Sequence, residues 1–333
     1  MRRVGAAFFP QDKHLDIQGG LYSRGLSQQM VWLSGLLPYE RCVEVLRRIG
    51  GYRLNASSVW RQTQIQGAKM LVQAQQAQAQ VNPERLQVAP AWADHERVKG
   101  VSLDGGMVNI RQQGWKEMKV GAIYDVGLRL EYDKRTDEYA EFAHADNLAY
   151  TAVLGDVAAF APALWALAVQ EHVPTAHTSS VTSDGADWIW NLADDLFPDS
   201  CQIVDYFHAL QHLALAAAAL FPDQPAQAER WYADRQDDLF LGHIAAITIP
   251  LDQAGLPEFS HYFHNHQRRM QYQQFREDGF PIGSGSVEST VKQFKTRLSG
   301  PGMRWNLDAA QRMLLIRAAV LDGSFDERCL SAA

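Results

Sequence analysis

The sequence predicts an α/β protein in which a mixed sheet with helices on both faces follows an all-α region. Two observations support this prediction. Short runs rich in β-branched and aromatic residues occupy positions 98–144, and helical and strand patterns then alternate as far as residue 220. An antiparallel meander followed by alternating units is typical of a mixed sheet. Residues 31–81, in contrast, have a helical pattern throughout.

The composition is that of a globular protein, with 333 residues of which 47% are hydrophobic and 21% are charged. The formal charge of −7 excludes a uniformly basic nucleic-acid binder but is compatible with a local basic face. The three cysteines are far apart in the sequence, which excludes a paired zinc motif and favours a reducing cytoplasm as the location. No uncharged apolar run is long enough to span a bilayer.

The N-terminal region has the outline of a helix-turn-helix. A helix is predicted to begin at Pro38 and to end at Gly50-Gly51, and a second helix follows from Ser58. Two helices joined by a glycine turn, over about residues 38–81, are common to helix-turn-helix modules and to ordinary helical hairpins. The pattern by itself leaves both interpretations open.

In the first interpretation the second helix reads DNA. It would present Ser58, Arg61 and Gln62, which are residue types that contact base edges or phosphates. A glutamine- and alanine-rich spacer and two prolines come next, and they predict a boundary near residue 90. We therefore expect a helical DNA-binding region over 1–90 and a second domain over 91–333.

The second domain is expected to begin with the strands of the sheet. Asn147 is predicted to cap a long helix, Asp187 to cap the helix that follows the fifth strand, and His208 to open a further helix. A mainly helical, polar stretch then covers about residues 210–280. The predicted strands are 98–103, 119–126, 128–132, 139–144, 177–183 and 201–205.

Three acidic residues occupy comparable places at the ends of these elements. Asp104 follows the first strand, Asp184 follows the strand 177–183, and Glu288 lies at the start of a helix. If the first strand and the strand before Asp184 are neighbours, the two aspartates share one edge of the sheet. Three carboxylates without cysteine or histidine suit Mg²⁺ or Mn²⁺. Glu277 is the next candidate for the third ligand, and for Asp184 the alternative is a helix cap.

Four blocks of sequence resemble, in this order, the DDE transposases of bacterial insertion sequences. The similarity is greatest to the ISKra type, which is related to eukaryotic Mutator-like elements, and it extends over about residues 30–320. The blocks are Val-Ser-Leu-Asp-Gly-Gly at 101–106, Ser-Asp-Gly-Ala-Asp-Trp-Ile-Trp at 183–190, Asp-Tyr-Phe-His at 205–208 and Gly-Ser-Gly-Ser-Val-Glu-Ser at 283–289.

The resemblance implies a ribonuclease-H-like catalytic domain with a helical insertion between the second aspartate and the glutamate. It implies that Asp104, Asp184 and Glu288 are the catalytic, metal-binding triad, with two Mg²⁺ or Mn²⁺ ions, and that Asp205 and His208 form an accessory pair. It also favours the DNA-binding interpretation of the N-terminal region. The expected partners are double-stranded DNA, as element ends and target, and further copies of the chain in a dimer or larger assembly.

A basic stretch follows Glu288, and a basic stripe there would suit DNA phosphates. The competing functions are a nuclease without strand transfer and a truncated or domesticated protein that only binds DNA. Trp188 and Trp190 are expected to be packing residues, and His261, His264 and His266 are expected to lie on a solvated polar helix. Residues 289–320 contain one acidic residue, Asp308, and six basic residues: Lys292, Lys295, Arg297, Arg304, Arg312 and Arg317.

Overall fold

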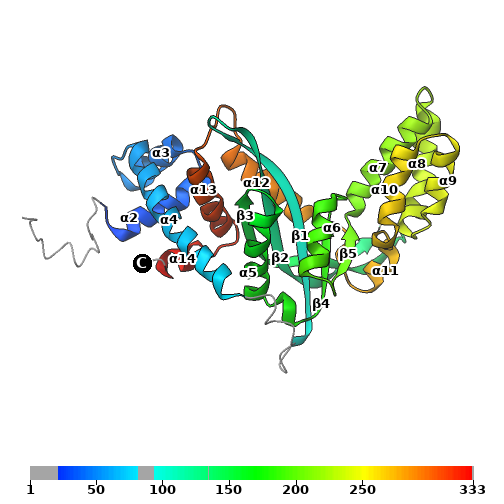
Figure 1. Cartoon of the computed structure of the whole chain (residues 1–333), viewed down its shortest axis with the longest axis horizontal. Coiled ribbons are helices and arrows are strands. Elements are labelled where there is room, and N and C mark those ends of the chain that lie inside the picture. The colour runs from blue at the N-terminus through cyan, green and yellow to red at the C-terminus, as the bar shows by residue number, and fades with distance from the viewer. Residues whose placement is uncertain (1–21, 82–93, 134, 332–333) are drawn as a thin grey trace, which may run out of the picture. The chain divides into compact units, whose positions relative to one another are not determined.

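The computed structural model describes residues 22–81, 94–133 and 135–331 (Figure 1). The chain forms two compact units, and neither is continuous in sequence. Unit 1 comprises Met1–Ala77, Val108–Lys116 and Phe294–Ala333, and unit 2 comprises Gln78–Met107 and Glu117–Gln293. The predicted boundary near residue 90 falls in 82–93, outside the described residues. Unit 1 differs from the predicted region 1–90 because it includes two segments from later in the chain.

Unit 1 is helical apart from its segment of the β1–β2 hairpin, and α3 has the limits that the sequence predicts. Pro38 is the N-cap of α3, and Gly51 ends that helix in the left-handed conformation with φ of 69°. The predicted succession of helix, glycine turn and helix is therefore confirmed. The helices of the unit are α2 (Arg24–Leu36), α3 (Tyr39–Gly50), α4 (Ala56–Gln80), α13 (Leu307–Leu321) and α14 (Phe325–Ser331).

Two apolar clusters hold these helices together. Met30 of α2 packs with Cys42 and Leu46 of α3 and with Val59 of α4. Ser58, which the sequence predicts at a DNA-reading position, is buried instead and accepts a hydrogen bond from Tyr22 Oη at 2.9 Å. A second cluster joins α2 and α4 to the C-terminal helices through Val31, Met70, Ile316, Ala319, Phe325 and Cys329.

Unit 2 contains a five-stranded mixed sheet, which confirms the predicted α/β class. The strand order is β3-β2-β1-β4-β5, so β1 and β4 are neighbours although far apart in sequence. β4 runs parallel to both β1 and β5, whereas β2 and β3 are antiparallel. The strands are β1 (Asp94–Ile110), β2 (Gly114–Asp133), β3 (Glu138–Leu154), β4 (Ala176–Ser183) and β5 (Cys201–Val204).

The first three strands are longer than the sequence predicts. β1 continues through Gly105 and Gly106 because neither glycine takes a positive φ, so both fit extended backbone. The predicted strands 119–126 and 128–132 are one strand, β2. Asn147 does not cap a helix. It lies within β3 at φ of 51°, beside an irregularity in the β2–β3 register, and its amide donates to Asp125.

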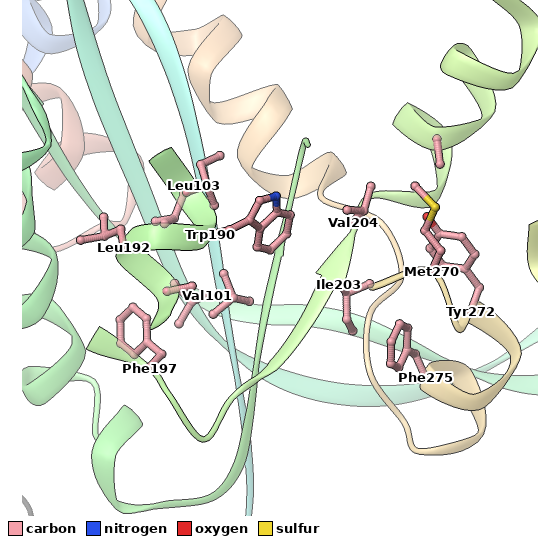
Figure 2. Close-up of a cluster of buried hydrophobic side chains, with 14 of the residues drawn as sticks. Val101, Leu103, Trp190, Leu192, Phe197, Ile203, Val204, Met270, Tyr272 and Phe275 are labelled. Atoms are coloured by element: carbon pink, nitrogen blue, oxygen red, sulfur yellow. The ribbon is translucent and has the colours of Figure 1, made fainter. Parts of the chain in front are cut away.

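The main apolar core of unit 2 lies between the sheet and its helices. Figure 2 shows residues of β1, α6, β5 and the 270–275 segment within this cluster, among them the buried Trp190. The stretch predicted to be a helical insertion is helical. The helices are α5 (Val157–Gln170), η2 (Val173–Thr175), α6 (Asp187–Leu196), α7 (Tyr206–Leu220), α8 (Pro225–Phe240), α9 (Ala245–Gln253), α10 (Pro257–His266), η3 (Gln267–Arg269), α11 (Tyr272–Glu277) and α12 (Gly285–Leu298).

Across the described segments, no helix combines the length and the apolar character that a membrane crossing requires.

Candidate active site beside two parallel strands

The register of β1 and β4 brings Asp104 and Asp184 to the same level of the sheet. Val101 of β1 is paired with Val181 of β4. Asp104 lies three residues further along β1, and Asp184 directly follows Ser183, the last residue of β4. One step before them, the buried backbone N–H of Leu103 donates to Ser183 Oγ at 2.8 Å. Two carboxylates that come from chain segments 80 residues apart are therefore placed on β1 and directly after the end of the adjacent β4.

Short local hydrogen bonds orient both carboxylates. Asp104 Oδ1 accepts from the N–H of Gly105 at 2.5 Å, and Asp184 Oδ1 accepts from the N–H of Ala186 at 3.0 Å. Ala186 is the N-cap of α6, so Asp184 stabilises the turn before that helix and does not cap it. The predicted cap, Asp187, is the exposed first residue of α6, where its charge favours the helix dipole.

Hydrogen bonds hold the segment 281–284 beside the ends of β4 and β5. Thr182 Oγ1 of β4 donates to the carbonyl of Pro281 at 3.1 Å, and the N–H of Tyr206 donates to the carbonyl of Ile282 at 2.8 Å. The buried carboxylate of Asp205 accepts from the Oγ of Ser284 at 2.6 Å and also from its N–H. The same carboxylate caps α7 by accepting from the N–H of His208 at 2.8 Å.

The hydrogen bonds of segment 281–284 position the start of α12. The helix begins at Gly285, immediately after Ser284, and Glu288 lies in its first turn. The backbone that carries Glu288 therefore emerges from a segment bonded to the ends of β4 and β5. The side chain of Glu288 is outside the described residues. Glu277, the alternative third ligand, lies at the end of α11 and accepts from Gln273.

Histidine and tyrosine side chains from α7 and α10 lie beside Asp184. Nε2 of His208 and Nε2 of His212 are 3.3 Å apart, and the His212 ring stacks on Tyr262 with ring centroids 3.7 Å apart. Tyr262 also contacts His266, which is 5% exposed, so the prediction of a solvated position for this histidine is wrong. Since Tyr262 and His266 follow Asp184 by about eighty positions, no local pattern reveals this contact.

Burial determines the protonation of this group. It lowers the pKa of His212, and the adjacent His208 and His266 lower it further, against the effect of Asp184. Burial also lowers the pKa of His266. The pKa of Tyr262 is raised, first by burial and then by the negative charges of Asp184 and Asp205. His212, His266 and Tyr262 are therefore uncharged at neutral pH, and they add no positive charge beside Asp184.

Gly185 is required by the close approach of α10. A Cβ at this position would lie 2.6 Å from the Tyr262 ring and 3.2 Å from His266 Nε2. Its φ is not positive, so this position requires glycine for steric reasons and not for its backbone conformation. Because Gly185 has no side chain, α10 can pack close to Asp184.

A buried lysine lies near Asp104. Lys119 Nζ pairs with Glu117 Oε1 at 2.8 Å and lies 4.0 Å from the centre of the Trp188 ring. A Cβ added to Gly105 would be 3.1 Å from the same Glu117 oxygen, which places this ion pair next to the residue after Asp104. Trp188 and Trp190 are packing residues, as the sequence predicts.

The residues predicted to bind DNA differ in exposure. Arg61 is exposed on α4 and Gln62 is partly exposed. Lys292, Lys295 and Arg304 are exposed as well. The predicted basic stripe is wrong for Arg297 and Arg317, which are buried.

The guanidinium groups of Arg297 and Arg317 donate hydrogen bonds within unit 1. Arg297 Nε donates to the carbonyl of Ser34 at 2.5 Å, and Arg317 Nη1 donates to the carbonyl of Gly35 at 2.8 Å. Both carbonyls lie in the last turn of α2, where a positive charge stabilises the free C=O groups.

The carboxylates at this edge of the sheet are the type of ligand that suits Mg²⁺ or Mn²⁺. Among side chains that the structure describes, no group of three or more histidine, cysteine, aspartate or glutamate residues is placed to hold a metal ion, and Glu288 is not in that set. The chain matches no protein-family model and no curated protein.

Proposed function

We propose that this protein is a transposase that cuts and joins DNA at the ends of an insertion sequence. One observation carries the proposal: Asp104 on β1 and Asp184 immediately after the end of the adjacent parallel strand β4 lie at the same level of the sheet, an arrangement that would suit a shared cation. The order of the four sequence blocks adds the reaction class, because it is the order of the DDE transposases that the chain resembles.

We infer a ribonuclease-H-like arrangement for unit 2. The strand order β3-β2-β1-β4-β5, with a meander at one side and two parallel strands at the other, supports this inference. The helical stretch between the second aspartate and the glutamate corresponds to the insertion that the resemblance implies.

In this proposal Asp104, Asp184 and Glu288 hold the metal ions. Bound Mg²⁺ or Mn²⁺ would activate a water or hydroxyl group and stabilise the leaving oxygen of a phosphodiester. The protein contributes the positions of the ligands. Asp205 keeps segment 281–284, and with it the first turn of α12, beside β4 and β5. The uncharged His212 and His266 leave the charge of Asp184 available to a cation.

DNA binding is assigned to α4 and to the exposed basic residues of the C-terminal part. Arg61 and Gln62 lie in the second turn of α4, after the glycine turn that follows α3. Lys292, Lys295 and Arg304 would contact phosphates. An assembly of two or more copies is part of the proposal, because two element ends must be joined to one target.

The test uses substitutions that keep side-chain volume and remove charge. Asp104→Asn, Asp184→Asn and Glu288→Gln should each abolish cleavage of a labelled duplex that carries the DNA flanking the gene. The melting temperature and the gel shift should stay close to those of the unmodified protein. Asp187→Asn is the matched control, because Asp187 is an exposed carboxylate in the same sequence block. It should remain active.

Metal dependence gives a second measurement on the same substrate. Cleavage should require Mg²⁺ or Mn²⁺ and fail in Ca²⁺, which coordinates oxygen ligands with looser geometry. Full cleavage in EDTA, or an active Asp184→Asn variant, would refute the proposal. Cleavage without joining to a target duplex would identify a nuclease instead, and binding without cleavage would identify a DNA-binding protein.

A further inference from the structure

Unit 1 contains a large pocket that the proposed catalytic site does not use. Its volume is about 1140 Å³, enough to enclose a nucleotide, and its lining residues all belong to unit 1. The walls are the start of α3, one turn of α4, the turn between β1 and β2, the end of α12 and the segment 302–306.

Backbone pairing shapes one wall of this pocket. The N–H of Arg111 donates to the carbonyl of Trp305 at 2.8 Å, and the N–H of Trp305 donates to the carbonyl of Asn109 at 3.0 Å. The indole Nε1 of Trp305 donates to the carbonyl of Leu298 at 2.8 Å. The turn between β1 and β2 and the segment after α12 are therefore joined, so this wall is preformed.

An exposed aromatic side chain stands on another wall. Trp60 projects from α4 with 44% of its surface exposed, although large aromatic side chains usually bury most of theirs. An indole face that is open to a pocket can stack on a planar ring.

The pocket has an excess of positive charge. Arg111, Arg297 and Arg304 line it against the single acidic residue Glu40. Arg111 and Arg304 are exposed, so their guanidinium groups can reach a ligand. Three cations and one anion favour an anionic ligand, and phosphate is the anion whose geometry an arginine fork matches best.

Arg297 supplies an unsatisfied donor in the pocket wall. It is 2% exposed and lies between the rings of Tyr39 and Trp305, at 5.2 and 5.1 Å from their centres. Its Nη2 is buried without a hydrogen-bond partner in the described part of the chain. Burial lowers the pKa of Arg297, an effect that the neighbouring Tyr39 partly offsets. This buried cation adds positive charge to the wall of the pocket.

We propose that this pocket binds an unpaired nucleotide of a DNA strand, with its base against Trp60 and its phosphates against Arg111 and Arg304. Aromatic stacking combined with cations along the backbone is the general chemistry of single-strand binding. The choice of DNA rests on the proposed function. A DNA enzyme that opens or distorts a duplex end needs a place for an unpaired base, and this pocket offers both required contacts.

The experiment measures binding of a fluorescent oligothymidine to the full chain by anisotropy, without added metal. Trp60→Ala should weaken binding about 5- to 150-fold, as expected for the loss of one stacked base. Trp60→Phe should retain most of the affinity, because it keeps an aromatic face. Arg304→Gln should weaken binding and reduce the slope of log K against log salt by about 0.7 if one phosphate contact is lost.

Matched controls come from the same unit. Trp32 on α2 is 39% exposed and Arg53 is exposed, and neither lines the pocket. Trp32→Ala and Arg53→Gln should bind the oligothymidine as the unmodified protein does. If Trp60→Ala weakens binding no more than Trp32→Ala, the inference is overturned. If thymidine monophosphate alone binds as tightly as the strand, the pocket is a site for free nucleotides and the assignment to a strand is wrong.

The result is separable from that of the proposed function. Asp184→Asn should leave oligothymidine binding unchanged while it removes cleavage. Normal strand binding by Trp60→Ala together with a cleavage-negative Asp184→Asn would reject the pocket and keep the proposed function. If the protein binds the strand through this pocket but cleaves no DNA, the pocket assignment is kept and the proposed function is rejected.

Discussion

Replacing Asp205 by alanine should destabilise unit 2 far more than the loss of an ordinary helix cap. The carboxylate is 6% exposed and accepts hydrogen bonds from His208 N–H, Ser284 N–H and Ser284 Oγ. The cap alone contributes about 1 kcal/mol. Each Ser284 donor left without an acceptor adds about 1–2 kcal/mol. The expected loss in free energy of unfolding is therefore about 3–5 kcal/mol.

Asp156 is a matched control for this prediction. It is the N-cap of α5 and accepts from the N–H of Ala159 at 2.9 Å, but it is exposed and serves that helix. Asp156→Ala should cost about 1 kcal/mol. Asp205→Asn should lower the free energy of unfolding by an amount between those of Asp205→Ala and Asp156→Ala. Its Oδ1 can still cap α7, but its amide NH₂ faces the Ser284 donors.

The assay is urea unfolding followed by circular dichroism, with the slope of the transition compared between variants. Equal losses for Asp205→Ala and Asp156→Ala would refute the reasoning, because the Ser284 bonds would then add nothing. The same variants should be tested for cleavage of the labelled duplex under conditions where they are folded. Loss of cleavage in folded Asp205→Asn would show that the position of segment 281–284 matters for the reaction.

Three further predictions concern helix α4, the buried histidines and the cysteines. Arg61→Ala should weaken binding to an element end by about 1–3 kcal/mol if Arg61 contacts a base, and an equal loss on every sequence in a gel shift would indicate a phosphate contact. Because burial lowers the pKa of His212 and His266, the unfolded chain takes up protons that the folded chain does not. Stability should therefore be full above about pH 6.5 and fall below it, by at most about 1.4 kcal/mol per pH unit for each histidine. His266→Gln should flatten this dependence in urea midpoints, and an unchanged slope would contradict it. Burial raises the pKa of all three thiols to about 11, so iodoacetamide near pH 8 should modify the folded protein much more slowly than the unfolded one, in a mass-spectrometric time course of Cys42, Cys201 and Cys329.

The sequence by itself determined the elements whose limits are set by local chemistry. The proline before α3 and the left-handed Gly51 after it mark that helix in any context. The alternation of strands and helices after residue 144 predicts the mixed sheet. These signals depend on residues within one or two turns of each other, so they need no knowledge of the fold.

Tertiary structure decided everything that depends on distant partners. Gly105 and Gly106 look like a turn, yet pairing with neighbouring strands keeps them extended. Arg297 looks like a surface charge in the sequence, yet it is buried and donates to the carbonyl of Ser34 at the end of α2. The level of Asp104 and Asp184 depends on a strand register, and the bond from Asp205 to Ser284 spans 79 residues. Such contacts form because packing and hydrogen-bond satisfaction act across the whole chain, whereas local patterns report propensities alone.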